Sequence, residues 1–139
     1  MKKLITILSL SIIMVSCEVE GNLTKDKLPN SIDPSTSVLK YSGTFIGTAG
    51  ITASGQVKIY LEGNLNKVKL ENFSIEDGPD LKVYLSKTVI PNDFVNLGNL
   101  TSSTIYEIPT NVIVSDYPYV LIHCQQYNHT FAIAQLIQN

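Results

Sequence analysis

The chain has 139 residues, of which 44% are hydrophobic and 16% charged, with eight glycines and six prolines. This length accommodates a single domain, and the composition excludes a disordered, collagen-like or coiled-coil chain. The ten basic residues are all lysine and face twelve acidic residues, which gives a net charge of −2. Because phosphate recognition depends on clustered Lys and Arg, this balance argues against a nucleic-acid partner.

The N-terminus has the pattern of an export signal. Two lysines precede an apolar run over residues 4–15, which is shorter than the roughly 20 residues of a transmembrane helix. The run ends in the string MVSC, which resembles a bacterial lipobox and would place the lipid on Cys17. A plain secretory cleavage site is the alternative. We predict a lipoprotein signal peptide over 1–16 and a lipid-anchored protein of the bacterial cell envelope, with the outer membrane as the expected membrane.

A polar stretch follows the predicted lipidation site. Residues 17–38 contain Pro29 and Pro34 together with several Ser, Thr, Asp and Asn residues, and they show no apolar period. Such a composition is typical of a flexible linker. The stretch is therefore predicted to be a tether between the membrane and one domain over residues 39–139.

From residue 39 onward, short apolar segments alternate with turn residues. In the segment 56–62, Val57, Ile59 and Leu61 fall on one face of an extended chain and polar or aromatic residues on the other. The expected strands are 41–48, 56–62, 67–75, 81–86, 93–97, 105–108, 119–125 and 130–137. Turn signals arrive about every 10 residues, which predicts an all-β fold: a single antiparallel β-sandwich or barrel-like domain of about eight strands.

The most distinctive string is Asp77-Gly78-Pro79-Asp80, followed directly by the strand sequence LKVYLS. In their order and spacing this string and later ones resemble the DM-thirteen domain, a β-rich extracellular module also found beside DOMON domains. The resemblance spans residues 39–137. The residues that carry it are Asp77, Gly78, Pro79, Asp80, Tyr84, Tyr106, Pro109 and the late cysteine, Cys124.

This resemblance implies an electron-transfer role. The family's cysteine is proposed to act as a bare thiol or as the ligand of a group such as haem, and the matching position here is Cys124. The resemblance thus makes Cys124 the candidate redox thiol and an envelope redox or surface protein its expected partner. The sequence alone identifies no cofactor.

Cys124 can also be interpreted as a core residue with no redox role. It shares strand parity with Val120 and Ile122, and free cysteines are commonly small buried hydrophobes. A buried Cys124 favours the alternative function, a non-enzymatic surface module that binds a partner. Serine-hydrolase, phosphate-loop and zinc-protease motifs are absent from the sequence, so no independent catalytic activity is expected.

Two sets of side chains could hold a metal ion. Cys124 and His129 offer a thiolate and an imidazole, which are zinc and copper ligands. His123 and Cys124 are neighbours in a strand and so point to opposite faces. Asp77 and Asp80 could offer oxygens to calcium, although the same residues are ordinary turn chemistry. A small metal-handling domain is therefore the third interpretation.

Overall fold

The computed structural model describes residues 31–139 of the chain. The predicted signal peptide, the lipidation site Cys17 and most of the predicted tether lie outside the described residues. Within residues 31–139, no helix has the length and apolar character needed to cross a membrane.

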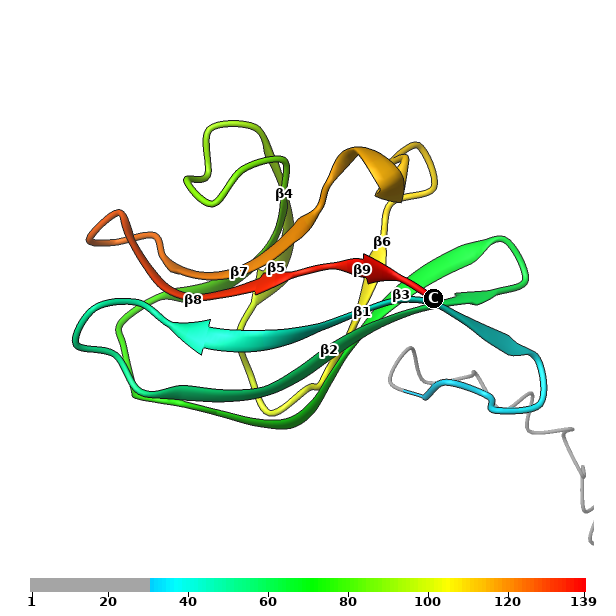
Figure 1. Ribbon diagram of the computed structural model, residues 1–139, viewed down its shortest axis with the longest axis horizontal. Helices are drawn as coiled ribbons and strands as arrows, with labels where there is room; N and C mark the ends of the chain where they lie inside the picture. The colour runs from blue at the N-terminus through cyan, green and yellow to red at the C-terminus, as the bar shows by residue number, and fades with distance from the viewer. Residues whose placement is uncertain (1–30) are drawn as a thin grey trace, which may run out of the picture.

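Antiparallel strands make up nearly all of the regular structure (Figure 1). The elements are β1 (Ser37–Gly47), β2 (Ala53–Glu62), β3 (Leu65–Ile75), β4 (Leu81–Ser86), β5 (Phe94–Asn99), β6 (Ile105–Ile108), the 3₁₀ turn η1 (Val114–Asp116), β7 (Tyr119–Cys124), β8 (His129–Gln135) and β9 (Ile137–Gln138). The strands lie in the order β5-β4-β7-β8-β1-β2-β3-β6, and β9 pairs with β1. The predicted all-β fold is confirmed.

The sheet curls until its two outer strands approach each other, so that it is nearly closed into a barrel. β5 and β6 are in contact, and the side chain of Tyr106 in β6 reaches across to the end of β5. Its hydroxyl lies 3.2 Å from the carbonyl oxygen of Asn99 and 3.1 Å from that of Ser103. The phenol of Tyr106 thus ties the two edges together where no strand ladder does.

The segment predicted as one strand over 130–137 is two strands, and this prediction was wrong. β8 pairs with residues 45–47 of β1, whereas β9 pairs with residues 41 and 42. The two ladders are separated at Gly43, where the backbones approach so closely that a Cβ would lie 2.4 Å from the carbonyl oxygen of Gln135. Leu136, between β8 and β9, donates its N–H to the carbonyl oxygen of Pro118 at 2.8 Å. This contact continues the pairing of β8 with β7 past Gln135, on the side away from β1.

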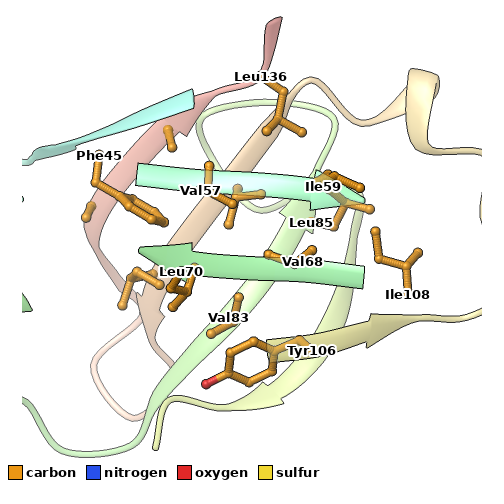
Figure 2. Close-up of a cluster of buried hydrophobic side chains, with 14 of the residues drawn as sticks. Phe45, Val57, Ile59, Val68, Leu70, Val83, Leu85, Tyr106, Ile108 and Leu136 are labelled. Atoms are coloured by element: carbon orange, nitrogen blue, oxygen red, sulfur yellow. The ribbon is translucent and has the colours of Figure 1, made fainter. Parts of the chain in front are cut away.

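The interior of the barrel is filled by the alternating apolar residues of each strand (Figure 2). The inward residues predicted in β2, β3 and β4 are confirmed: Val57, Ile59, Val68, Leu70, Leu81, Val83 and Leu85 are buried in one cluster. Leu61, predicted on the same face as Val57 and Ile59, is only half-buried because it lies at the end of the barrel. Burial of each large aliphatic side chain contributes about 1.5–3 kcal/mol.

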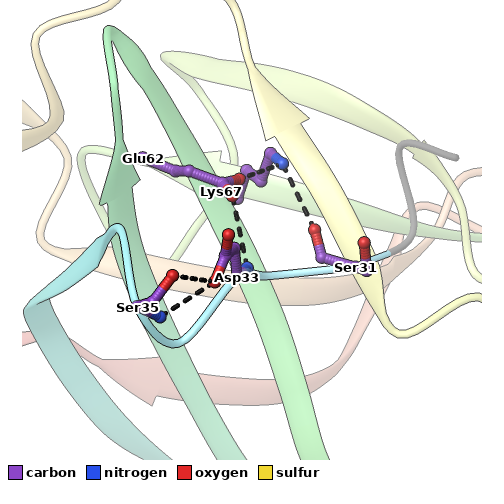
Figure 3. A network of polar contacts seen from close by, with 5 residues as sticks. All are labelled: Ser31, Asp33, Ser35, Glu62 and Lys67. Atoms are coloured by element: carbon purple, nitrogen blue, oxygen red, sulfur yellow. Dashed lines mark hydrogen bonds and ion pairs between the residues drawn. The ribbon is translucent and has the colours of Figure 1, made fainter. Parts of the chain in front are cut away.

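The segment before β1 contacts a nearly buried ion pair between Lys67 and Glu62, which we call the Lys67 clip (Figure 3). The Lys67 ammonium contacts the carboxylate of Glu62, and the two side chains are only 8% and 11% exposed. Lys67 also donates to the carbonyl oxygen of Ser31 at 3.3 Å, and the backbone N–H of Asp33 donates to Glu62 Oε1 at 3.2 Å. Asp33 in turn accepts from the N–H and hydroxyl of Ser35. Residues 31–35 are therefore fastened to the β2–β3 hairpin.

Candidate functional site

Cys124 is the last residue of β7, and its side chain points into the barrel. It belongs to the core cluster with Val120 and Ile122, as their shared parity predicts, and it is fully buried. Its strand neighbours are Leu81 in β4 and His129 in β8. The thiol donates a hydrogen bond to the carbonyl oxygen of Pro79, with Sγ and oxygen 2.8 Å apart.

The turn over residues 77–80 covers this thiol, and we call it the Pro79 turn. Gly78 lies directly against the ring of Phe131: a Cβ at this position would be 2.8 Å from Cε2 and Cζ of that ring. Asp80 adopts a left-handed conformation with φ of 57°. Its carbonyl oxygen accepts the backbone N–H of Gln125 at 3.1 Å, just beyond Cys124. The turn thus contacts the end of β7 at Cys124 and Gln125, and β8 at Phe131.

A salt bridge on the surface holds the far end of the Pro79 turn. The ammonium of Lys82 lies 2.6 Å from Oδ1 of Asp80, and it also contacts the side-chain oxygen of Asn99. Lys82 is 14% exposed, whereas Asp80 is 40% exposed. Asp77, the other acid of the string, is exposed.

In the closed domain the thiol of Cys124 is fully buried and donates to a backbone carbonyl oxygen. Nucleophilic cysteines, by contrast, lie in electropositive and partly exposed surroundings. The sulfur of Cys124 is therefore out of reach of a reagent in the closed domain.

His123 lies on the opposite face of β7, as the strand alternation predicts. Its Nδ1 is 3.0 Å from the hydroxyl oxygen of Thr130, and its ring stacks on Tyr84 with centroids 5.3 Å apart. Tyr84 stacks in turn on Phe94 at 4.1 Å. Burial lowers the pKa of the His123 imidazole from its ordinary value. His123 also lies on the other face of β7 from the Cys124 sulfur.

The residues considered for metal binding lie near one another, in pairs rather than in larger sets. Cys124 and His129 are register partners, but the thiol is buried and the imidazole of His129 is exposed and packs edge-on against Phe131 at 5.6 Å. Among residues 31–139, no group of three or more His, Cys, Asp and Glu side chains is arranged to hold an ion. Asp77 and Asp80 belong to the Pro79 turn described above.

The other residues that carry the family resemblance, Tyr84, Tyr106 and Pro109, contribute to packing, edge closure and a turn. Burial raises the pKa of the Tyr84 phenol, whose ring lies between His123 and Phe94. Tyr106 closes the β5–β6 edge, and the carbonyl oxygen of Pro109 accepts the N–H of Val112 at 3.0 Å in the following turn. These positions are distributed around the barrel, whereas the Pro79 turn is hydrogen-bonded to Cys124.

Sequence reasoning missed the hydrogen-bond partner of the thiol. The Pro79 carbonyl carries no titratable group, so no chemical signal marks it. The register that pairs Leu81 with Cys124 brings the turn and the cysteine together, and this register is a property of the folded sheet. The one clue in the sequence was that both strings occur in the same family resemblance.

Comparison with known protein families gives one match. The family model described as the electron transfer DM13 domain matches residues 44–136. No curated protein and no solved structure gives a significant match. The matched segment starts inside β1, ends just after β8 and includes both the Pro79 turn and Cys124. The chain therefore belongs to the DM13 electron transfer domain family.

Proposed function

We propose that the domain is a redox accessory whose thiol, Cys124, reacts with a partner only when the Pro79 turn opens. The observation that carries this proposal is the 2.8 Å contact between Cys124 Sγ and the Pro79 carbonyl oxygen. It joins the single thiol of the described residues to the most distinctive string of the sequence. A cover of this kind protects the thiol from adventitious oxidation between encounters.

The chemistry available to one thiol is exchange with a disulfide of a partner protein. After the turn opens, the thiol gives its proton to solvent and the thiolate attacks one sulfur of that disulfide. A bond forms between Cys124 and this sulfur while the partner's own S–S bond breaks, and the second sulfur leaves as a thiolate. A further thiol of the partner then attacks the mixed disulfide and releases Cys124 in its reduced form.

The proposal extends to the place where this happens. The apolar run over residues 4–15 and the string ending at Cys17 support a bacterial lipoprotein in the cell envelope, anchored in the outer membrane. Its partner is then an envelope redox or surface protein. In bacterial cells fed an alkyne-tagged palmitate, we expect label on the natural chain and on Cys124→Ser, but not on Cys17→Ser. Label on the Cys17→Ser chain would contradict the anchor.

The second candidate function is a non-enzymatic binding module. The complete burial of Cys124 favours it, because a thiol that never leaves the core has no chemistry. In that case the loops or a sheet face would contact the partner, and Cys124 would serve as packing.

Thiol labelling distinguishes the two functions. A Cys17→Ser chain has Cys124 as its only thiol, and the rate of its modification gives the free energy of the opening that exposes it. For a gated thiol we expect labelling at least about 100-fold slower than in the urea-unfolded chain, yet an opening free energy at least about 2 kcal/mol below that of global unfolding. Global unfolding is measured separately by urea denaturation.

An opening free energy equal to that of global unfolding would contradict the gated thiol and support the binding module. The Cys17→Ser/Cys124→Ala chain serves as the control for reaction at other side chains. Any signal that it gives is subtracted before the two free energies are compared.

A further inference from the structure

The two outer faces of the barrel differ in character. On β2 and β3 the outward side chains include Lys58, Lys69 and Glu71, which form ion pairs with one another. On β7 and β8 the outward positions include the apolar residues Leu121 and Ile133. Outward faces of antiparallel sheets are normally polar. The neighbours of Leu121 in β7 point into the core, so Leu121 itself faces outward. It is nevertheless fully buried, and other parts of the protein therefore cover this side of the sheet.

A loop over residues 87–93 stands on this apolar side (Figure 1). Its base is closed by the ion pair of Lys87 with Asp93 at 2.7 Å and by the N–H of Lys87, which donates to the Asp93 carbonyl at 3.0 Å. Its tip carries Val89 and Ile90, both exposed. Because the base of the loop is closed, Val89 and Ile90 are held beside the sheet and enlarge the apolar surface on this side.

A pocket of about 350 Å³ lies between this loop and β1. Its apolar wall consists of Ile46 and Ile133, which are cross-strand partners, together with Val89 and Tyr119. Ile46 is 71% exposed, so one side of the pocket is open. No charged side chain lines it.

A second hollow of about 290 Å³ adjoins the pocket and shares two of its lining residues, Thr44 and Gln135. The side chains of these two residues make no hydrogen bond with other described residues, so a hydroxyl and an amide are available where the hollows meet. The combination is an apolar end next to neutral hydrogen-bonding groups.

We propose that this outer pocket binds a neutral, mostly apolar small molecule that carries one hydrogen-bonding group. Its volume falls at the lower end of the range of roughly 300–1,000 Å³ for small-molecule sites. A charged group placed inside the pocket would lose part of its hydration without meeting an opposite charge, so the uncharged lining favours a neutral ligand. A stable dimer needs about 800 Å² from each partner, more than a pocket of this size presents, so we favour a small ligand over a second copy of the chain.

Nile red, a neutral fluorescent ring compound with one carbonyl group, is a suitable probe. The chain contains no Trp, so the dye signal is free of indole fluorescence. With the Cys17→Ser chain we expect one dye per domain and a dissociation constant of about 10–100 µM, as for a small ligand with ordinary binding efficiency. Decanol should displace the dye, and decanoate should not at the same concentration.

The variant Ile46→Lys places an ammonium in the apolar wall and should weaken dye binding at least about tenfold. Ile113→Lys is the matched control, because Ile113 is similarly exposed, at 64%, and does not line the pocket. This variant should bind the dye as the parent chain does.

Equal affinity for the dye in both variants, or no saturable binding below 1 mM dye, would overturn the proposal. So would sedimentation of the parent as a dimer that Ile46→Lys dissociates, because the face would then be an interface between copies. None of these outcomes bears on the thiol of Cys124.

Discussion

Replacing Gly78 by valine is expected to accelerate labelling of Cys124 about tenfold to 100-fold while the domain stays folded. A Cβ at this position would lie 2.8 Å from two ring atoms of Phe131 and 3.1 Å from Cδ2 of Leu81. Both neighbours are core side chains, so the Pro79 turn rather than the core must give way. Overpacking of this kind costs about 1–3 kcal/mol, and 1.4 kcal/mol corresponds to about tenfold in the population of the open turn.

The comparison needs a glycine variant that leaves the cover intact. Gly63→Asn serves, because Gly63 has no atom within 4 Å of its Cβ position and a φ of 60° that Asn tolerates. Labelling in this control should match that of the parent. If Gly78→Val lowers the free energy of global unfolding by as much as it lowers that of opening, the turn is not an independent gate and the proposed redox access is wrong.

Lys67→Met is expected to lower the free energy of unfolding by about 3–5 kcal/mol. Lys67 and Glu62 are both nearly buried, so the substitution leaves the Glu62 carboxylate in the barrel end without its ammonium, and removing one partner of a buried pair has a cost of this size. It also removes the hydrogen bond to the Ser31 carbonyl. Urea denaturation of the two chains measures the difference.

Lys69→Met is the matched control on the same strand. Lys69 points outward, is 37% exposed and lies 3.1 Å from Glu71, so we expect a loss below about 1 kcal/mol. The double variant Lys67→Met/Glu62→Leu should recover part of the stability, because it also removes the buried carboxylate of Glu62. If Lys67→Met and Lys69→Met lowered the free energy of unfolding by similar amounts, the buried Lys67–Glu62 pair would be no more important for stability than the more exposed Lys69–Glu71 pair.

The repeating strand pattern was enough to predict most of the fold. β4 and β6 have the predicted bounds, and the inward faces of β2, β3 and β4 follow from alternation alone. Alternation does not reveal where a ladder changes partner. The break between β8 and β9 depends on the close approach of Gly43 to Gln135, a contact between residues 92 positions apart. It is invisible to a local pattern.

The candidate site was predictable only in part. The inward position of Cys124 and the outward position of His123 follow from strand parity, and the structure has both. The Pro79 carbonyl lies 45 residues from Cys124 in the chain, and backbone oxygens leave no mark in a sequence. The stack of His123 on Tyr84 depends in the same way on the register of β4 against β7.

The Lys67 clip has a mechanical consequence. β1 starts beside Glu62 and ends beside Ala132, so residues 31–35 and the Cys124 end of β7 lie at opposite ends of the barrel (Figure 1). Tension applied through the N-terminal segment loads the clip first and then shears the long β1–β2 ladder, in which many hydrogen bonds share the load. The Pro79 turn lies outside this line of force. A force applied to the chain from its N-terminal side would therefore leave Cys124 covered. Exposure of Cys124 would instead depend on contacts made at the opposite end of the domain.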